Sequence, residues 1–112
     1  MRLVGIELCA RGTFPDLEFD KAVELVKVMP RHSALSFAGQ LTYPAYKHIP
    51  TSYIVCENDF IITLDKQQKF IERIKAESGK EVDVHTLNTG HCPNVTAPEE
   101  LVKVIISIAT SV

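Results

Sequence analysis

The chain has 112 residues, of which 46% are hydrophobic, so its size suits one compact domain and its composition is neither disordered nor collagen-like. Acidic and basic residues are interspersed and leave a net charge of -2, which excludes the strongly basic surface that gathers nucleic acid or an anionic membrane. The three cysteines are an odd number without Cys-x-x-Cys spacing, and the sequence shows neither a leader-like segment nor a run of about 18 apolar residues. We therefore expect a soluble, cytoplasmic protein with reduced thiols.

The N-terminal part predicts one strand followed by helices. Residues 2–9 are apolar, short and followed by Gly12, which favours a buried strand. Within residues 16–29 apolar side chains recur at helical spacing, with a proline before the segment and another after it, so we expect an amphipathic helix. Residues 31–37 favour a second, short helix, and residues 42–46 read as an aromatic connector.

Two strands joined by a helix are predicted next. Residues 53–57 are almost continuously apolar, as in a strand that is covered on both faces. Thr63 is placed to cap a helix that ends at Gly79, and residues 82–87 form the second strand. Because parallel strands joined by a helix cross over with the same right hand, the loops that follow them emerge at one edge of the sheet. Polar residues of these two loops should therefore lie close together.

A helix is predicted at the end of the chain. Thr96 and Glu99 have the spacing of a Ser/Thr-x-x-Glu capping box, and Pro98 falls in the first turn, where its missing N–H is not needed. Apolar side chains occupy nearly every face of residues 101–109. A helix that is apolar all round predicts a buried helix.

A polar loop over residues 88–93 lies between the second strand and this helix. It carries His91, with Gly90 before it to allow a sharp turn and Pro93 after it to prevent another strand. Asp59 follows the first strand. Open α/β folds place their chemistry at the carboxyl edge of the sheet. We therefore expect the Asp59 carboxylate to reach the His91 imidazole at roughly 2.6–3.2 Å.

The last two thirds of the chain resemble the C-terminal part of a cap-bearing α/β-hydrolase. The resemblance implies a partial α/β-hydrolase fold, in which a short parallel sheet has flanking helices and a remnant helical cap. It implies one domain over residues 1–112, with a strand and cap-like helices in 1–48 and a βαβα unit in 49–112. The motifs that carry it are the acidic loop Cys56-Glu57-Asn58-Asp59-Phe60-Ile61-Ile62, Gly90-His91, and Pro98-Glu99-Glu100.

This resemblance also implies roles for two residues and exposes a deficit. Asp59 matches the acid and His91 the base of a catalytic triad. The nucleophile elbow, Gly-x-Ser-x-Gly, has no counterpart, and neither has the glycine-bearing oxyanion loop. We expect the isolated chain to lack serine-hydrolase activity. The serines, none of which has glycines at the elbow spacing, are at positions 33, 36, 52, 78, 107 and 111.

In cap-bearing hydrolases, the segment before residue 49 forms a helical lid over the substrate. The resemblance therefore implies that Phe37, Tyr43 and Tyr46 line an apolar substrate pocket. The alternative is that these aromatic side chains pack the cap onto the core, as buried aromatic residues usually do.

Other combinations of reactive residues are weaker. Cys92 is adjacent to His91, but adjacent residues of an extended loop tend to point apart. Asp83 and His85 share one strand face and could join His91 around a metal. Zinc, however, needs three or four convergent ligands, and the sequence offers one such pair. We expect no metal and no cofactor.

Two classes of function stay open. The first is a hydrolase of secondary-metabolite type that acts on a small-molecule ester, thioester or lactone and is truncated and inactive alone. The second is a non-catalytic module that binds a ligand or dimerises. Two or three strands cannot cover the apolar helix of residues 101–109, so a second copy or a complementing hydrolase half is the expected partner, beside a small molecule.

Overall fold

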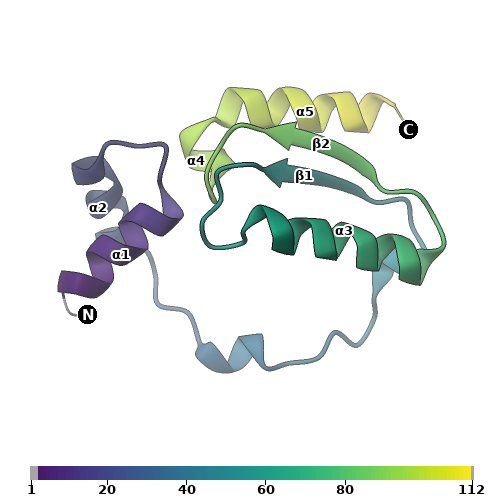
Figure 1. Cartoon of the computed structure of the whole chain (residues 1–112), viewed down its shortest axis with the longest axis horizontal. Coiled ribbons are helices and arrows are strands. Elements are labelled where there is room, and N and C mark those ends of the chain that lie inside the picture. The colour runs from purple at the N-terminus through teal and green to yellow at the C-terminus, as the bar shows by residue number, and fades with distance from the viewer. Residues whose placement is uncertain (1–2, 112) are drawn as a thin grey trace.

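The computed structural model describes residues 3–111, and Figure 1 shows two parallel strands between two helices, with a helical pair beyond one end of the strands. The predicted architecture, a short parallel sheet with flanking helices, is confirmed. No helix in the described part is long and apolar enough to cross a membrane. The elements are helices α1 (Leu3–Thr13) and α2 (Phe19–Val28), 3₁₀ turns η1 (Ala34–Phe37) and η2 (Ala45–Lys47), β1 (Ser52–Cys56), α3 (Leu64–Ser78), β2 (Asp83–Leu87), α4 (Pro93–Thr96) and α5 (Pro98–Thr110).

The sheet has the topology that the sequence predicts. β1 pairs with β2 in parallel, in a register that runs from Ser52 opposite Asp83 to Cys56 opposite Leu87. Both strands lie within one residue of their predicted bounds. Helix α3 contacts β1 and helix α5 contacts β2. Because α3 returns the chain to the start of β2, the carboxyl ends of both strands, and the loops that follow, lie at the same edge.

Helix α3 fixes the end of β1 through a buried polar side chain. The Gln67 amide donates to the Cys56 carbonyl at 2.9 Å and accepts from the Cys56 N–H at 2.9 Å, so it pairs with the strand backbone. The predicted end at Gly79 is confirmed, with a left-handed φ of 67°. Thr63 is the N-cap residue of α3, as predicted, but its side chain makes no capping hydrogen bond.

The predicted strand at residues 2–9 is wrong. Helix α1 occupies this segment, except for Arg2, which lies outside the described residues. A short apolar run does not by itself distinguish a strand from a buried helix. The tertiary partner decides here, since Ala10 and the adjoining Phe14 form a core cluster with Ala22 and Val26 of α2. The predicted helix at 16–29 is confirmed, although it is shorter at both ends.

Helix α5 differs from its prediction in burial and in capping. None of its residues is buried, and Val102, Ile105 and Ile106 are about half exposed, so the predicted buried helix is wrong for this chain. A sheet of two strands offers one narrow face, which cannot cover an all-apolar helix. The predicted capping box is also wrong: Thr96 ends α4, and its hydroxyl donates to Asp16 at 2.6 Å instead.

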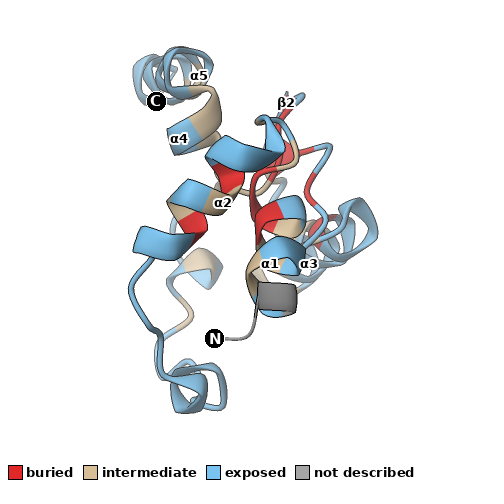
Figure 2. Cartoon of the chain, turned by 90° about the vertical axis from the view of Figure 1, so that its left-hand side faces the viewer, coloured by how far each residue is buried: buried red, intermediate tan, exposed pale blue. Residues whose placement is uncertain are grey.

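The segment between α2 and β1 is almost entirely exposed, as the pale blue lower part of Figure 2 shows. Residues 31–37, for which the sequence predicts a short helix, contain the 3₁₀ turn η1. Glu77 of α3 holds the end of this segment: it accepts a hydrogen bond from Tyr46 and pairs with Lys47 at 3.2 Å and Arg73 at 2.7 Å. These hydrogen bonds, led by that of Tyr46, lower the pKa of Glu77 from 4.5 to about 2.

Replacing Glu77 by glutamine should therefore remove a stabilisation that depends on pH. A carboxyl whose pKa is depressed in the folded state stabilises the fold fully above its unfolded pKa of 4.5, and the effect disappears as pH falls towards 2. We expect the melting temperature of Glu77→Gln to lie below that of the wild type above pH 4.5 and to converge with it on acidification. Thermal unfolding followed by circular dichroism measures this. A difference in melting temperature that is independent of pH would contradict it.

Candidate active site

Asp59 and His91 meet at the carboxyl ends of the two strands. His91 Nδ1 lies 2.9 Å from Asp59 Oδ2, within the predicted range, so the predicted contact is confirmed. The Asp59 side chain is 6% exposed and the His91 side chain 32% exposed. The carboxylate is thus shielded from water while the imidazole keeps one accessible side.

The other oxygen of Asp59 holds its own loop. Asp59 Oδ1 accepts hydrogen bonds from the N–H groups of Ile61 at 2.8 Å and Ile62 at 2.9 Å, the local turn that an aspartate side chain makes with the backbone ahead of it. This use of Oδ1 fixes the carboxylate and leaves Oδ2 for His91. Together with the His91 ring, these N–H groups give the buried Asp59 carboxylate three hydrogen-bond partners, which replace the water lost on burial.

The contact defines the state of the His91 ring. An ionised carboxylate only accepts hydrogen bonds, so Nδ1 carries a proton and donates a hydrogen bond to Asp59. In the neutral ring Nε2 is then the acceptor nitrogen, and it has no hydrogen-bond partner in the part of the chain that the structure describes. In a catalytic triad, the carboxylate orients the base in this way while Nε2 faces the nucleophile.

The linker between α1 and α2 braces the His91 loop. Asp16 Oδ2 accepts hydrogen bonds from the N–H of Gly90 at 3.1 Å and from the Thr96 hydroxyl at 2.6 Å. Pro15 lies so close to Gly90 that a Cβ at residue 90 would stand 2.5 Å from its Cδ. The residue before the histidine therefore has to be glycine for this packing. We call Pro15, Asp16, Gly90 and Thr96 the loop clamp.

Three candidates for substrate binding lie away from this pair. Phe37 and Tyr43 are 81% and 66% exposed and pack on histidines of their own segment. Tyr46 binds Glu77 near the end of α3, at the opposite end of the sheet from His91. The structure does not bring Phe37, Tyr43 or Tyr46 to the Asp59–His91 pair, and their role in substrate binding stays a prediction.

The Cys92 thiol is a poor nucleophile where it stands. Cys92 is half buried against the core of α1 and α2, and this burial raises its pKa. The nearby carboxylates of Asp59 and Asp16 raise that pKa further. The reactive thiolate is therefore disfavoured.

A second set of serine, aspartate and histidine lies at the strand starts, but its order is wrong for catalysis. Asp83 Oδ2 stands between its partners, at 3.1 Å from the Ser52 hydroxyl and 2.7 Å from His85 Nε2. A triad needs the histidine in the middle, where it can take the serine proton. His91 lies beyond the far end of β2, and no group of three possible metal ligands occurs in the described ranges.

The loop clamp and one cavity could not be predicted from the sequence. The hydrogen bonds of the clamp join residues that are separated by 74 and 80 positions in the chain, and no local sequence pattern predicts such contacts. The cavity, of about 560 Å³, lies between α1, α2 and Phe60, the residue after Asp59. The packing of α1 on α2 forms this cavity, and a strand at residues 2–9, as predicted from the sequence, does not imply that packing.

Comparisons with known proteins agree with this geometry. Residues 4–104 match the alpha/beta hydrolase family. The chain is also similar to "Probable hydrolase R7" of Phoma sp., with 45% identity over 94 residues, which cover 84% of this chain. That stretch is 38% of the length of the Phoma sp. protein, so the chain spans well under half of this relative. With a family match that extends over nearly its whole length, the chain belongs to the alpha/beta hydrolase family.

Proposed function

We propose that the chain supplies the acid and the base of a hydrolase site for a small-molecule ester, thioester or lactone of secondary-metabolite type. A nucleophile-bearing hydrolase half completes this site, because the sequence has no Gly-x-Ser-x-Gly elbow. The observation that carries the proposal is the 2.9 Å contact between Asp59 and His91 at adjoining strand ends. The name of the similar "Probable hydrolase R7" supports the reaction type.

Each residue has a defined step in this reaction. His91 Nε2 takes the proton of the serine hydroxyl from the other half as the serine oxygen attacks the substrate carbonyl carbon. Asp59 stays ionised and stabilises the imidazolium. His91 then gives the proton to the leaving alcohol or thiol, and an acyl-enzyme remains. A water molecule, deprotonated by His91, attacks the acyl carbon, and the serine recovers its proton as the acid leaves.

Complementation tests this proposal. The chain alone should neither bind a fluorophosphonate probe covalently nor hydrolyse p-nitrophenyl butyrate. Mixed with the part of the Phoma sp. relative that it does not match, it should produce probe labelling on that part and turnover of the ester. A butyryl thioester and butyrolactone then separate the three substrate classes. The Phoma sp. part alone is the control.

Two results would speak against the proposal. One is labelling of the isolated chain that a single Ser→Ala change abolishes, since the nucleophile would then lie within the chain. The other is a mixture whose labelling and turnover equal those of the Phoma sp. part alone, which would leave Asp59 and His91 without a catalytic role.

The second candidate function, a non-catalytic dimerisation module, rests on the surface of the chain. The half-exposed Val102, Ile105 and Ile106 of α5 form an apolar surface, and each strand has one edge without a partner strand among the described residues. Exposed apolar patches and open strand edges both favour association. The two functions are compatible if the same surface receives the complementing half.

We expect the chain to self-associate at micromolar concentration, as measured by sedimentation velocity. Ile106→Glu should weaken the association about tenfold or more, because it introduces a charge into an apolar contact. Lys103→Glu, on the same helix, is the matched control and should have little effect, since Lys103 is already charged and exposed. A monomeric wild type would contradict the dimerisation function.

A further inference from the structure

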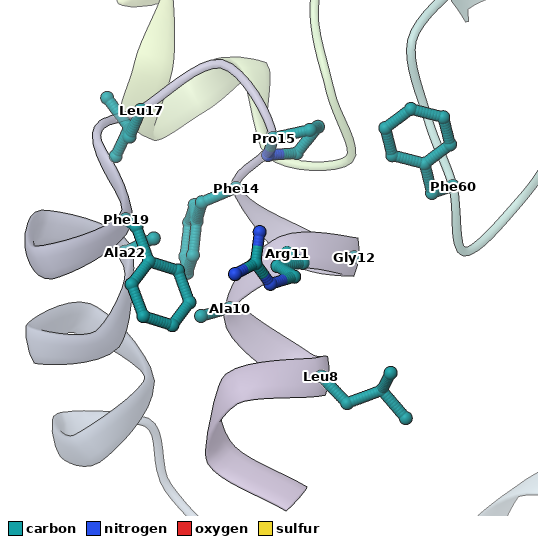
Figure 3. A pocket seen from close by; sticks show the side chains of 10 residues that line it. All are labelled: Leu8, Ala10, Arg11, Gly12, Phe14, Pro15, Leu17, Phe19, Ala22 and Phe60. Carbon is teal, nitrogen blue, oxygen red and sulfur yellow. The ribbon is translucent and has the colours of Figure 1, made fainter. Parts of the chain in front are cut away.

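The cavity between α1, α2 and Phe60 has an almost entirely apolar lining. Its volume is about 560 Å³, and Figure 3 shows that its walls come from α1, the linker that follows it, α2 and the loop after β1. One charged side chain, Arg11, is among the lining residues, and the others are apolar or glycine. The apolar residues with the largest side chains are Leu8, Phe14, Leu17, Phe19 and Phe60.

Arg11 is an exposed residue that stacks on an aromatic ring. Its guanidinium carbon lies 4.5 Å from the centre of the Phe19 ring, so one face of the group is covered by the aromatic side chain. No ion pair between described residues includes Arg11. The N–H groups point outward in the plane of the guanidinium, which leaves them available. A guanidinium with free N–H groups can bind a carboxylate through two parallel hydrogen bonds.

The cavity is linked to Asp59 and His91 through residues next to each of them. Phe60, which lines it, directly follows Asp59. Pro15 lines it as well and packs on Gly90, which directly precedes His91. Asp59 and His91 are not themselves among the lining residues, so the cavity approaches the pair only through these two neighbours.

We propose that this cavity binds the carboxylate end of the substrate, with Arg11 as the anion-binding residue. The substrate class narrows accordingly to an ester, thioester or lactone that carries a free carboxylate on an apolar chain. The link to catalysis rests on the function proposed above, whereas the binding of a carboxylate does not.

Binding of two isosteric probes tests the inference without any turnover. Hexanoate and hexanamide have the same chain and differ in charge, and isothermal titration calorimetry or ligand-observed NMR gives their dissociation constants with the full chain. We expect hexanoate to bind about tenfold more tightly than hexanamide, as a charge-assisted hydrogen-bonded pair at a partly exposed site would give. In Arg11→Gln, hexanoate should lose this advantage, while the dissociation constant of hexanamide stays unchanged and reports an intact cavity.

Two further variants sharpen the result. Arg31→Gln removes the same charge from the exposed segment after α2 and should leave both dissociation constants unchanged, which excludes a general charge effect. Arg11→Lys keeps the charge without the two-pronged geometry and should retain a reduced preference for hexanoate.

Three outcomes would overturn the inference: equal binding of the two probes by the wild type, no saturable binding of hexanoate, or a preference for hexanoate that survives Arg11→Gln. Its failure is distinct from failure of the proposed function. Hexanoate binding that depends on Arg11, without turnover in the complemented mixture, would reject the hydrolase and keep the anion site. Turnover in the complemented mixture without hexanoate binding would keep the hydrolase function and reject the anion site.

Discussion

Replacing Asp59 by asparagine is expected to lower the kcat of the complemented hydrolase about 10⁴-fold while leaving the fold intact. Asparagine keeps a carbonyl oxygen for the N–H groups of Ile61 and Ile62, so the loop after β1 retains its turn. The amide NH₂ of asparagine replaces the other carboxylate oxygen, and it cannot accept a hydrogen bond from the N–H of His91 Nδ1. The ring then favours the tautomer with the proton on Nε2, and this nitrogen can no longer take the proton of the serine. Hydrolysis of p-nitrophenyl butyrate measures the loss.

Two other variants separate catalysis from structure. Asp59→Ala also removes the loop hydrogen bonds and should lower the free energy of unfolding by about 2–5 kcal/mol, whereas Asp59→Asn should change it by about 1 kcal/mol or less. Asp83→Asn alters the other aspartate–histidine pair, at the strand starts, and should leave kcat unchanged. A kcat for Asp59→Asn close to that of the wild type would remove Asp59 from the role of triad acid.

The contact between Asp59 and His91 could be predicted because its placement follows from local patterns and one topological rule. The apolar runs around residues 53–57 and 82–87 are bounded by turn residues, and a helix of suitable length lies between them. Right-handed crossover then places the following loops at the same edge. Neither step needs knowledge of distant contacts, and the observed register agrees with both.

The surroundings of the pair could not be predicted because they depend on tertiary contacts. The apolar residues of α1 are compatible with a strand or a helix, and packing on α2 decides between them. Thr96 has the sequence spacing of a helix cap, yet its hydroxyl binds Asp16, which lies 80 residues earlier in the chain. The apolar pattern of α5 indicates burial, but burial also requires a covering surface, which the described residues do not provide.

The close packing in the loop clamp predicts that Gly90→Ala destabilises the protein. A Cβ at residue 90 would stand 2.5 and 2.6 Å from the Pro15 ring and 3.0 Å from Asp16 Oδ1. A proline ring cannot rotate out of the way, and Asp16 is held by Thr96, so the His91 loop has to move instead. We expect the free energy of unfolding to fall by about 1–3 kcal/mol, as for other overpacked sites, and the Gly90 N–H bond to Asp16 to break.

Gly12→Ala is the matched control for this substitution, and the pair of variants decides whether the clamp positions His91. At residue 12, a Cβ would meet Ile61 at an ordinary 3.6 Å, and in helix α1 alanine is favoured over glycine by about 0.5–1 kcal/mol. In urea unfolding, the free energy of unfolding should therefore fall for Gly90→Ala and rise for Gly12→Ala. Hydrogen exchange at residue 90 should accelerate in Gly90→Ala, and kcat of the complemented hydrolase should fall with it, because His91 leaves its place beside Asp59. If Gly90→Ala were as stable as Gly12→Ala and as active as the wild type, the close packing of Pro15 on Gly90 would have no part in holding His91.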